Sequence, residues 1–190
     1  PNVGSGIVTD GLSVSWTIAD KMGIRANQGL YGDFWYFEVT RNGGTVNQGA
    51  GLTIWEGDLD PYSADNVPPS VSINTSGGVW QNIIYYGGFT VTNTNYGFAV
   101  DYRGENPIVY VIIGGEVVAE WTMVDTFVPV HPLLYGNFTG EGLMYDETAN
   151  FGASAFTQDP CAALSSWGLG ATDVQALGLG WGVNATSSCP

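Results

Sequence analysis

Short alternating or fully apolar runs, separated by glycine-rich turns, make up most of the chain. Leu12–Trp16 and Glu116–Trp121 alternate apolar and polar residues, which is the period of a half-buried strand. Phe34–Thr40 is aromatic and β-branched and stops at an Asn-Gly-Gly turn signal, whereas Pro107–Ile113 is apolar and predicts a strand buried on both faces. The other strand-like runs are Gly51–Trp55, Trp80–Tyr86, Phe89–Thr92, Tyr96–Tyr102, Leu143–Tyr145 and Ala149–Phe151.

Helix signals are few and lie near the C-terminus. Asp159-Pro160 can start a helix over Cys161–Trp167, and Ala171–Leu177 could add a short helical turn. Many short strands separated by turns favour a two-sheet antiparallel β-sandwich over a helix-crossed parallel sheet. With 190 residues we expect one domain spanning 1–190, with residues 158–190 as a partly helical tail packed on the sandwich.

Net charge narrows the possible partners. The chain has 18 acidic and 4 basic residues, a formal charge of −14. Four cations cannot build a phosphate-binding patch, so nucleic acid is excluded as a partner. The same shortage of cations argues against binding to anionic membranes. The longest apolar stretch, Ile108–Ile113, is too short to cross a bilayer, so no membrane insertion is expected. An acidic, lysine-poor surface suits a secreted, extracellular or virion-surface protein in a salty medium.

The two cysteines, Cys161 and Cys189, both lie in the tail. Their spacing fits neither a redox pair nor a zinc site, since no further thiols are present. We therefore expect one disulfide that pins the tail, worth about 3 kcal/mol for a loop of that size.

Catalytic chemistry has few candidate residues. The strand-borne carboxylates are Glu38, Asp101, Glu116 and Glu120, and we expect them on solvated faces. Glu116 and Glu120 should face the same side of one strand, about 13 Å apart, which is too far for a retaining glycosidase pair. His131, the only histidine, stands in a proline-flanked extended segment and is expected to be a packed or surface residue. The prediction is that the protein is not an enzyme.

The longest stretch without a strand pattern, residues 56–69, is also the most acidic. Asp58, Asp60, Asp65 and Asn66 offer the hard oxygen ligands that Ca²⁺ prefers, although no glutamate closes an EF-hand. Calcium is the one cofactor that the sequence suggests; the alternative is an ordinary solvated loop.

Aromatic residues are the other resource for binding. Trp35 and Tyr110 lie within strand patterns and are expected in the core. Five others stand beside turn signals and could cluster at one end of the sandwich to stack on a protein or glycan ligand. These predicted ligand-binding residues are Trp55, Tyr62, Tyr85, Tyr86 and Tyr102.

Five runs over roughly residues 30–157 resemble, in order and spacing, the motifs of the SPRY domain family. The resembling segments are Phe34–Val39 (the family's "WYWEV" strand), Tyr96–Asp101 ("IGVALD"), Ile108–Ile113 with Gly114-Gly115 ("tvyFyvNG"), Pro129 and Pro132 ("yPavsl"), and Asn150–Gly152 with Phe156 ("NFG…pF"). The resemblance implies a concanavalin-like antiparallel sandwich used as a binding module. Family members share no common ligating residues, so the resemblance implies no particular binding residue.

These observations favour a non-catalytic, SPRY-like recognition or assembly domain that contacts its partner through loops. Two alternatives stay open: a carbohydrate-binding module or carbohydrate-active enzyme of the same fold, and a purely structural shell or appendage subunit that assembles with its own copies. Two carboxylates meeting in an aromatic-lined groove would favour the carbohydrate alternative.

Overall fold

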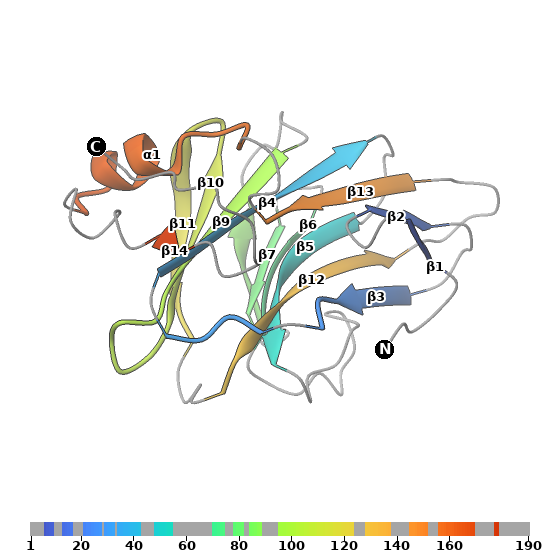
Figure 1. The fold of residues 1–190 in the computed structure, drawn as a ribbon, viewed down its shortest axis with the longest axis horizontal. Coiled ribbons are helices and arrows are strands. Elements are labelled where there is room, and N and C mark those ends of the chain that lie inside the picture. Colours follow the sequence, from blue (N-terminus) through green and yellow to red (C-terminus); the bar gives the residue numbers. More distant parts are fainter. Residues whose placement is uncertain are drawn as a thin grey trace.

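The described part of the chain folds into two β-sheets packed face to face, with one short helix, as a computed structural model shows (Figure 1). The structure describes residues 6–9, 13–16, 21–27, 29–32, 34–42, 48–54, 70–74, 78–81, 84–88, 95–123, 128–137, 145–151, 156–169 and 177–178. The prediction of a two-sheet antiparallel sandwich is confirmed.

The larger sheet has the strand order β1-β2-β13-β4-β9-β10-β11, and β14 pairs with β4. All of its pairs are antiparallel except β14 with β4. Its strands are β1 (Gly6–Thr9), β2 (Ser13–Trp16), β4 (Phe34–Asn42), β9 (Asn95–Asp101), β10 (Ile108–Ile113), β11 (Glu116–Thr122), β13 (Tyr145–Asn150) and β14 (Leu177–Gly178).

The smaller sheet is antiparallel throughout, with the order β3-β12-β5-β6-β7-β8. Its strands are β3 (Lys21–Arg25), β5 (Gln48–Ile54), β6 (Ser70–Asn74), β7 (Gly78–Gln81), β8 (Ile84–Gly88) and β12 (Val130–Asn137). The run predicted over Trp80–Tyr86 is in fact divided between β7 and β8. The strand predicted over Phe89–Thr92 lies outside the described residues.

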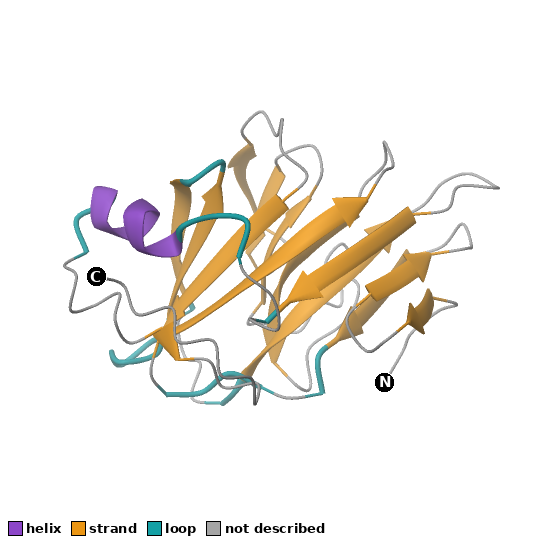
Figure 2. Cartoon of the chain, turned by 45° about the horizontal axis from the view of Figure 1, so that its top comes forward, coloured by secondary structure: helices purple, strands orange, loops and turns teal. Residues whose placement is uncertain are grey.

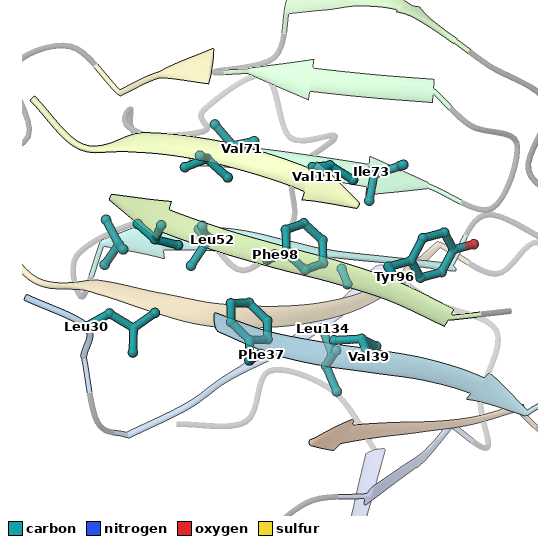
Figure 3. Packing of buried hydrophobic residues seen from close by; sticks show 14 of the residues in the cluster. Leu30, Phe37, Val39, Leu52, Val71, Ile73, Tyr96, Phe98, Val111 and Leu134 are labelled. Atoms are coloured by element: carbon teal, nitrogen blue, oxygen red, sulfur yellow. The ribbon is translucent and has the colours of Figure 1, made fainter. Parts of the chain in front are cut away.

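The inner faces of the two sheets meet in one apolar cluster (Figure 3). On the larger sheet the rings of Phe37 and Phe98 stack with their centroids 5.1 Å apart. Leu52 and Val71 approach from the smaller sheet and are fully buried. Within the smaller sheet there is no space for a side chain at Gly51, because an added Cβ would collide with the Val71 carbonyl oxygen and with Ser72 on the neighbouring strand β6.

The outer face of β4, β9, β10 and β11 in the larger sheet is also buried, under residues 156–169. The cluster there joins Tyr36 and Ile112 of the sheet to Leu164 of helix α1, with Phe156 packed against it. Val109 and Val111 of β10 belong instead to the inner cluster. Since β10 contributes to both clusters, the prediction that this strand is buried on both faces is confirmed.

Helix α1 (Pro160–Ser166) follows the predicted start signal (Figure 2, purple). The Asp159 side chain caps the helix by accepting hydrogen bonds from the backbone nitrogens of Cys161 and Ala162. The helical turn predicted over Ala171–Leu177 is wrong at Leu177, because this residue lies in strand β14 and pairs with Phe34 of β4. The other residues of that predicted turn lie outside the described part of the chain. No helix in the described part of the chain is long and apolar enough to cross a membrane.

Candidate functional site

One end of the sandwich is built from connections that are far apart in the sequence. At this end β4 begins at Phe34, and Asp101 at the end of β9 pairs with both Phe34 and Ile108. The β3–β4 connection reaches the same place, because Leu30 forms a bridge with Val130 at the start of β12. The β9–β10 loop and the β3–β4 connection lie at the lower left of Figure 1. Loops grouped on a rigid scaffold are common binding sites.

Four residues at this end form an exposed surface, which we call the tyrosine surface: Tyr31, Tyr102, Val128 and Pro129. The rings of Tyr31 and Tyr102 have centroids 5.5 Å apart and planes tilted by 51°. Tyr31 is 60% exposed and Val128 is 42% exposed, and Pro129 is exposed beside it. A tilted ring pair at this distance is attractive, so Tyr102 steadies Tyr31 while leaving it accessible.

The backbone beneath Tyr31 is held by β12. The Leu30 nitrogen donates to the Val130 carbonyl oxygen at 2.7 Å, and the Val130 nitrogen donates back at 3.1 Å. His131 is buried under the same connection, with Nδ1 2.9 Å from the Ala26 carbonyl oxygen. A side chain at Gly29 would meet the His131 ring, since an added Cβ would lie 2.9 Å from Nε2. His131 is therefore a packed residue, as predicted.

The ring of Tyr102 forms part of the surface, and its hydroxyl is hydrogen-bonded to the backbone. The hydroxyl donates to the Val128 carbonyl oxygen at 2.9 Å. Burial raises the pKa of Tyr102 well above its usual range, so the hydroxyl keeps its proton at any ordinary pH. The bond ties the β9–β10 loop to the segment entering β12 and fixes Val128 beside the two rings.

Arg103, next to Tyr102, is occupied by neighbours within the chain. Its Nε and Nη2 donate to the two carboxylate oxygens of Asp101, at 2.8 and 2.7 Å. The guanidinium carbon lies 4.9 Å from the centroid of the Phe34 ring. Burial alone would raise the pKa of Asp101, but the hydrogen bonds and charge of Arg103 outweigh it and hold that pKa below its usual range.

Tyr102 is the predicted ligand-binding residue that the structure places in this surface. Trp55 and Tyr62 lie outside the described residues. Tyr85 and Tyr86 lie in β8, the edge strand of the smaller sheet, and only their backbone is described.

Tyr31 was not among the predicted binding residues. It stands in the segment Gly29-Leu-Tyr-Gly32, which has no strand pattern. An aromatic residue between two glycines, outside every predicted strand, is the signal that could have indicated it.

Two of the carboxylates considered for catalysis lie on opposite faces of their strand. Glu116 and Glu120 were expected on one side of β11, which is wrong. Glu120 pairs with Tyr110 of the outer cluster, whereas Glu116 pairs with Ile113 of the inner cluster. The register shifts between these pairs, and the extra residue of this β-bulge reverses the alternation of side chains.

Glu38 was expected on a solvated face, and this too is wrong, because the side chain is only 1% exposed. Its two oxygens accept hydrogen bonds from the backbone nitrogens of Thr157, at 2.8 Å, and Gln158, at 2.7 Å. The Tyr36 hydroxyl donates to it at 3.0 Å. Burial and the neighbouring Glu38 raise the pKa of Tyr36 well above its usual range, so this donor stays protonated.

Gln158 extends the same network and helps to attach the segment before α1. Its Nε2 donates to Asn95 Oδ1 at 2.8 Å and to the Ile112 carbonyl oxygen at 3.1 Å. Its Oε1 accepts from the Gly115 nitrogen at 3.0 Å. Every described contact of Glu38 is thus structural: the carboxylate holds residues 156–169 on the outer face of the larger sheet.

The predicted calcium ligands Asp58, Asp60, Asp65 and Asn66 lie outside the described residues, so this site stays a prediction. Within the described ranges, no group of three His, Cys, Asp or Glu side chains could hold a metal ion. The predicted disulfide has the same standing, because Cys189 is not among the described residues.

Comparison with known proteins identifies the fold. No protein-family model and no curated protein matches the sequence. The structure is similar to the SPRY domain of human HERC1, with a TM-score of 0.58, 12% identity, and coverage of 76% of this chain and 91% of that one. The TRIM65 PSpry domain gives a TM-score of 0.51 at 13% identity over 70% of each chain. Stonustoxin gives 0.52 at 15% identity over 76% of this chain and 26% of its own.

These likenesses confirm the SPRY resemblance at the level of fold. The chain has a SPRY-like, concanavalin-like β-sandwich fold.

Proposed function

We propose that the protein is a non-catalytic protein-interaction domain that binds its partner through the tyrosine surface. One observation carries the proposal. The described part of the chain exposes three large hydrophobic side chains, Tyr31, Val128 and Trp167, and two of them belong to this one surface. Aromatic residues are enriched among those that dominate the energy of interfaces, particularly when they sit on a rigid frame.

The use made of the sheet faces supports the same choice. The inner faces of the two sheets are buried against each other. Residues 156–169 cover the outer face of four strands of the larger sheet. The loops at the end of the sandwich are therefore more accessible to a partner than these faces. A SPRY-like fold supports an interaction role as well, since domains of this family serve as binding modules.

A selection with matched variants tests the proposal. Random twelve-residue peptides displayed on phage are selected on the immobilised domain, resynthesised, and titrated against wild type, Tyr31→Ser and Trp167→Ser. Both substitutions remove an exposed aromatic side chain, but Trp167 lies on the outer face, where its indole donates to Glu120. Loss of an interface aromatic should weaken binding about five- to tenfold for Tyr31→Ser and leave Trp167→Ser unchanged.

The proposal fails if the selected peptides bind Tyr31→Ser as tightly as wild type. A glycan-array signal that depends on Tyr31, with no peptide binding, would instead favour the carbohydrate-binding alternative.

We also propose that the domain works in an extracellular or virion-surface setting, with a Cys161–Cys189 disulfide. The acidic, lysine-poor composition supports the setting. The disulfide is supported by the cysteine count, and Cys161 lies partly buried in α1 beside the outer cluster.

A further inference from the structure

We propose that the tyrosine surface receives a lysine or arginine side chain of the partner, held against the ring of Tyr31. This inference rests on the proposed function and adds the chemistry of the partner. It follows from the geometry of the two rings, from the internal hydrogen bonds that the Tyr102 hydroxyl and the Arg103 guanidinium make, and from the distribution of charge around the surface.

The ring pair offers a face for a cation. Tyr102 stands 5.5 Å from Tyr31 at an angle of 51°, so the two rings form a corner instead of a closed stack. Most of Tyr31 is in solvent. An ammonium or guanidinium group within about 6 Å of such a ring is attracted by the negative potential of its face. Val128 and Pro129 supply apolar surface beside the rings, which suits the methylene stem of a lysine or arginine.

Arg103, which follows Tyr102 in the sequence, does not occupy the face of the Tyr31 ring. Arg103 is held by both oxygens of Asp101 and stacks over the Phe34 ring, on a different aromatic residue. Its charge is therefore largely balanced within the domain. The chain already makes one arginine–aromatic contact internally, and the Tyr31 ring offers the same kind of contact to a partner.

The surrounding charge favours a basic partner. Glu105 is exposed in the same β9–β10 loop, and the whole chain carries a formal charge of −14. Of the other three cations, Lys21 and Arg41 lie toward the opposite ends of β3 and β4, and Arg25 Nη1 donates to the Ile54 carbonyl oxygen at 3.3 Å. The field of such a domain attracts cationic segments and repels acidic ones.

A double-mutant cycle on the selected peptides tests this chemistry. Each lysine of a binding peptide is replaced by norleucine, which keeps the apolar stem and removes the charge. Each peptide is then titrated against wild type, Tyr31→Phe and Tyr31→Leu, since phenylalanine keeps the ring and leucine keeps only apolar volume. For lysine peptides we expect Tyr31→Phe to bind like wild type and Tyr31→Leu to bind about two- to fivefold more weakly. That difference should disappear for the norleucine peptides.

Failure of this inference differs from failure of the proposed function. If peptides need Tyr31 but contain no lysine or arginine, or if norleucine peptides show the same Tyr31→Leu loss, cation recognition is wrong and the interaction site stands. If no peptide binding depends on Tyr31, both are wrong.

Discussion

Replacing Glu38 by glutamine should destabilise the domain and loosen residues 156–169, although the new side chain has almost the same shape. In the native protein the backbone nitrogens of Thr157 and Gln158 donate to different oxygens of this carboxylate. Glutamine has one carbonyl oxygen, so its amide NH₂ must face one of the two backbone N–H groups. One donor would lose its acceptor, and the remaining bond would lose its charge assistance.

The size of the loss follows from these two bonds. A hydrogen bond to a charged group is worth about 1.5–3 kcal/mol, and a buried donor left without an acceptor costs about 1–3 kcal/mol. The two figures describe overlapping effects, so we expect a decrease of about 2–3 kcal/mol in the free energy of unfolding. Such a decrease is a substantial fraction of the roughly 5–15 kcal/mol by which a typical domain is stable.

Urea unfolding followed by tryptophan fluorescence measures the decrease, and hydrogen exchange locates it. Amides of residues 156–169 should exchange faster in Glu38→Gln, whereas those of β5 and β12 should change only with the global stability. Glu120→Gln is the matched control, because Glu120 also lies on the outer face but is exposed, and its side-chain oxygen accepts from the Trp167 indole. A control of this kind should stay within about 0.5 kcal/mol of wild type. A Glu38→Gln protein as stable as Glu120→Gln would refute the reasoning.

Three further changes have expected outcomes. Asp101→Asn should lower the free energy of unfolding by about 1 kcal/mol at neutral pH, because it weakens the ion pair with Arg103. In the folded protein burial raises the pKa of Asp101, but the hydrogen bonds and charge of Arg103 outweigh burial and hold that pKa below its usual range. The extra stability of the wild type should therefore be complete above about pH 5 and disappear as the pH falls through the folded pKa; parallel plots of stability against pH for the two proteins would contradict this. Gly51→Ala should lower the free energy of unfolding, measured in urea, by about 2–3 kcal/mol, because the new Cβ would collide with the β6 backbone. Gly104→Ala should leave stability unchanged, because the nearest atom to its Cβ would be 3.7 Å away. Equal effects of the two substitutions would contradict this account of the packing. Native protein should show no thiol labelling at Cys161 or Cys189, and reduction should lower stability by about 3 kcal/mol; labelling of either cysteine before reduction would rule out the disulfide.

Local patterns predicted those features of the fold that local residues determine. Pro107–Ile113 indicated burial on both faces because its apolar residues occupy both alternating positions, and each set joins a different cluster. Asp159 and Pro160 indicated the start of α1 because capping depends only on the next few residues. The SPRY-like fold followed from several such runs in order.

Features that depend on distant residues were not predictable in this way. Glu38 occupies an outward position in its strand, and only the segment beginning about 120 positions later makes that position buried. Glu116 and Glu120 lie on opposite faces because of a bulge that no residue in their run indicates.

The candidate site was predictable only in part. Tyr102 was found because it follows a strand and precedes a turn signal. Tyr31 lies in a segment without a pattern, and its contact with Tyr102 joins positions 71 residues apart in the sequence. Pairing of this kind is set by the register of the sheets, which periodicity does not reveal.

Hydrogen exchange in the presence of a saturating selected peptide tests the location of the binding site most directly. Binding at the tyrosine surface should protect amides in residues 29–32, 102–106 and 128–130, and leave α1 and β11 unchanged. The same peptide should produce no protection in Tyr31→Ser at equal concentration. Protection confined to α1 and the Trp167 region, or to the strands of the smaller sheet, would contradict the claim that the domain binds through the tyrosine surface.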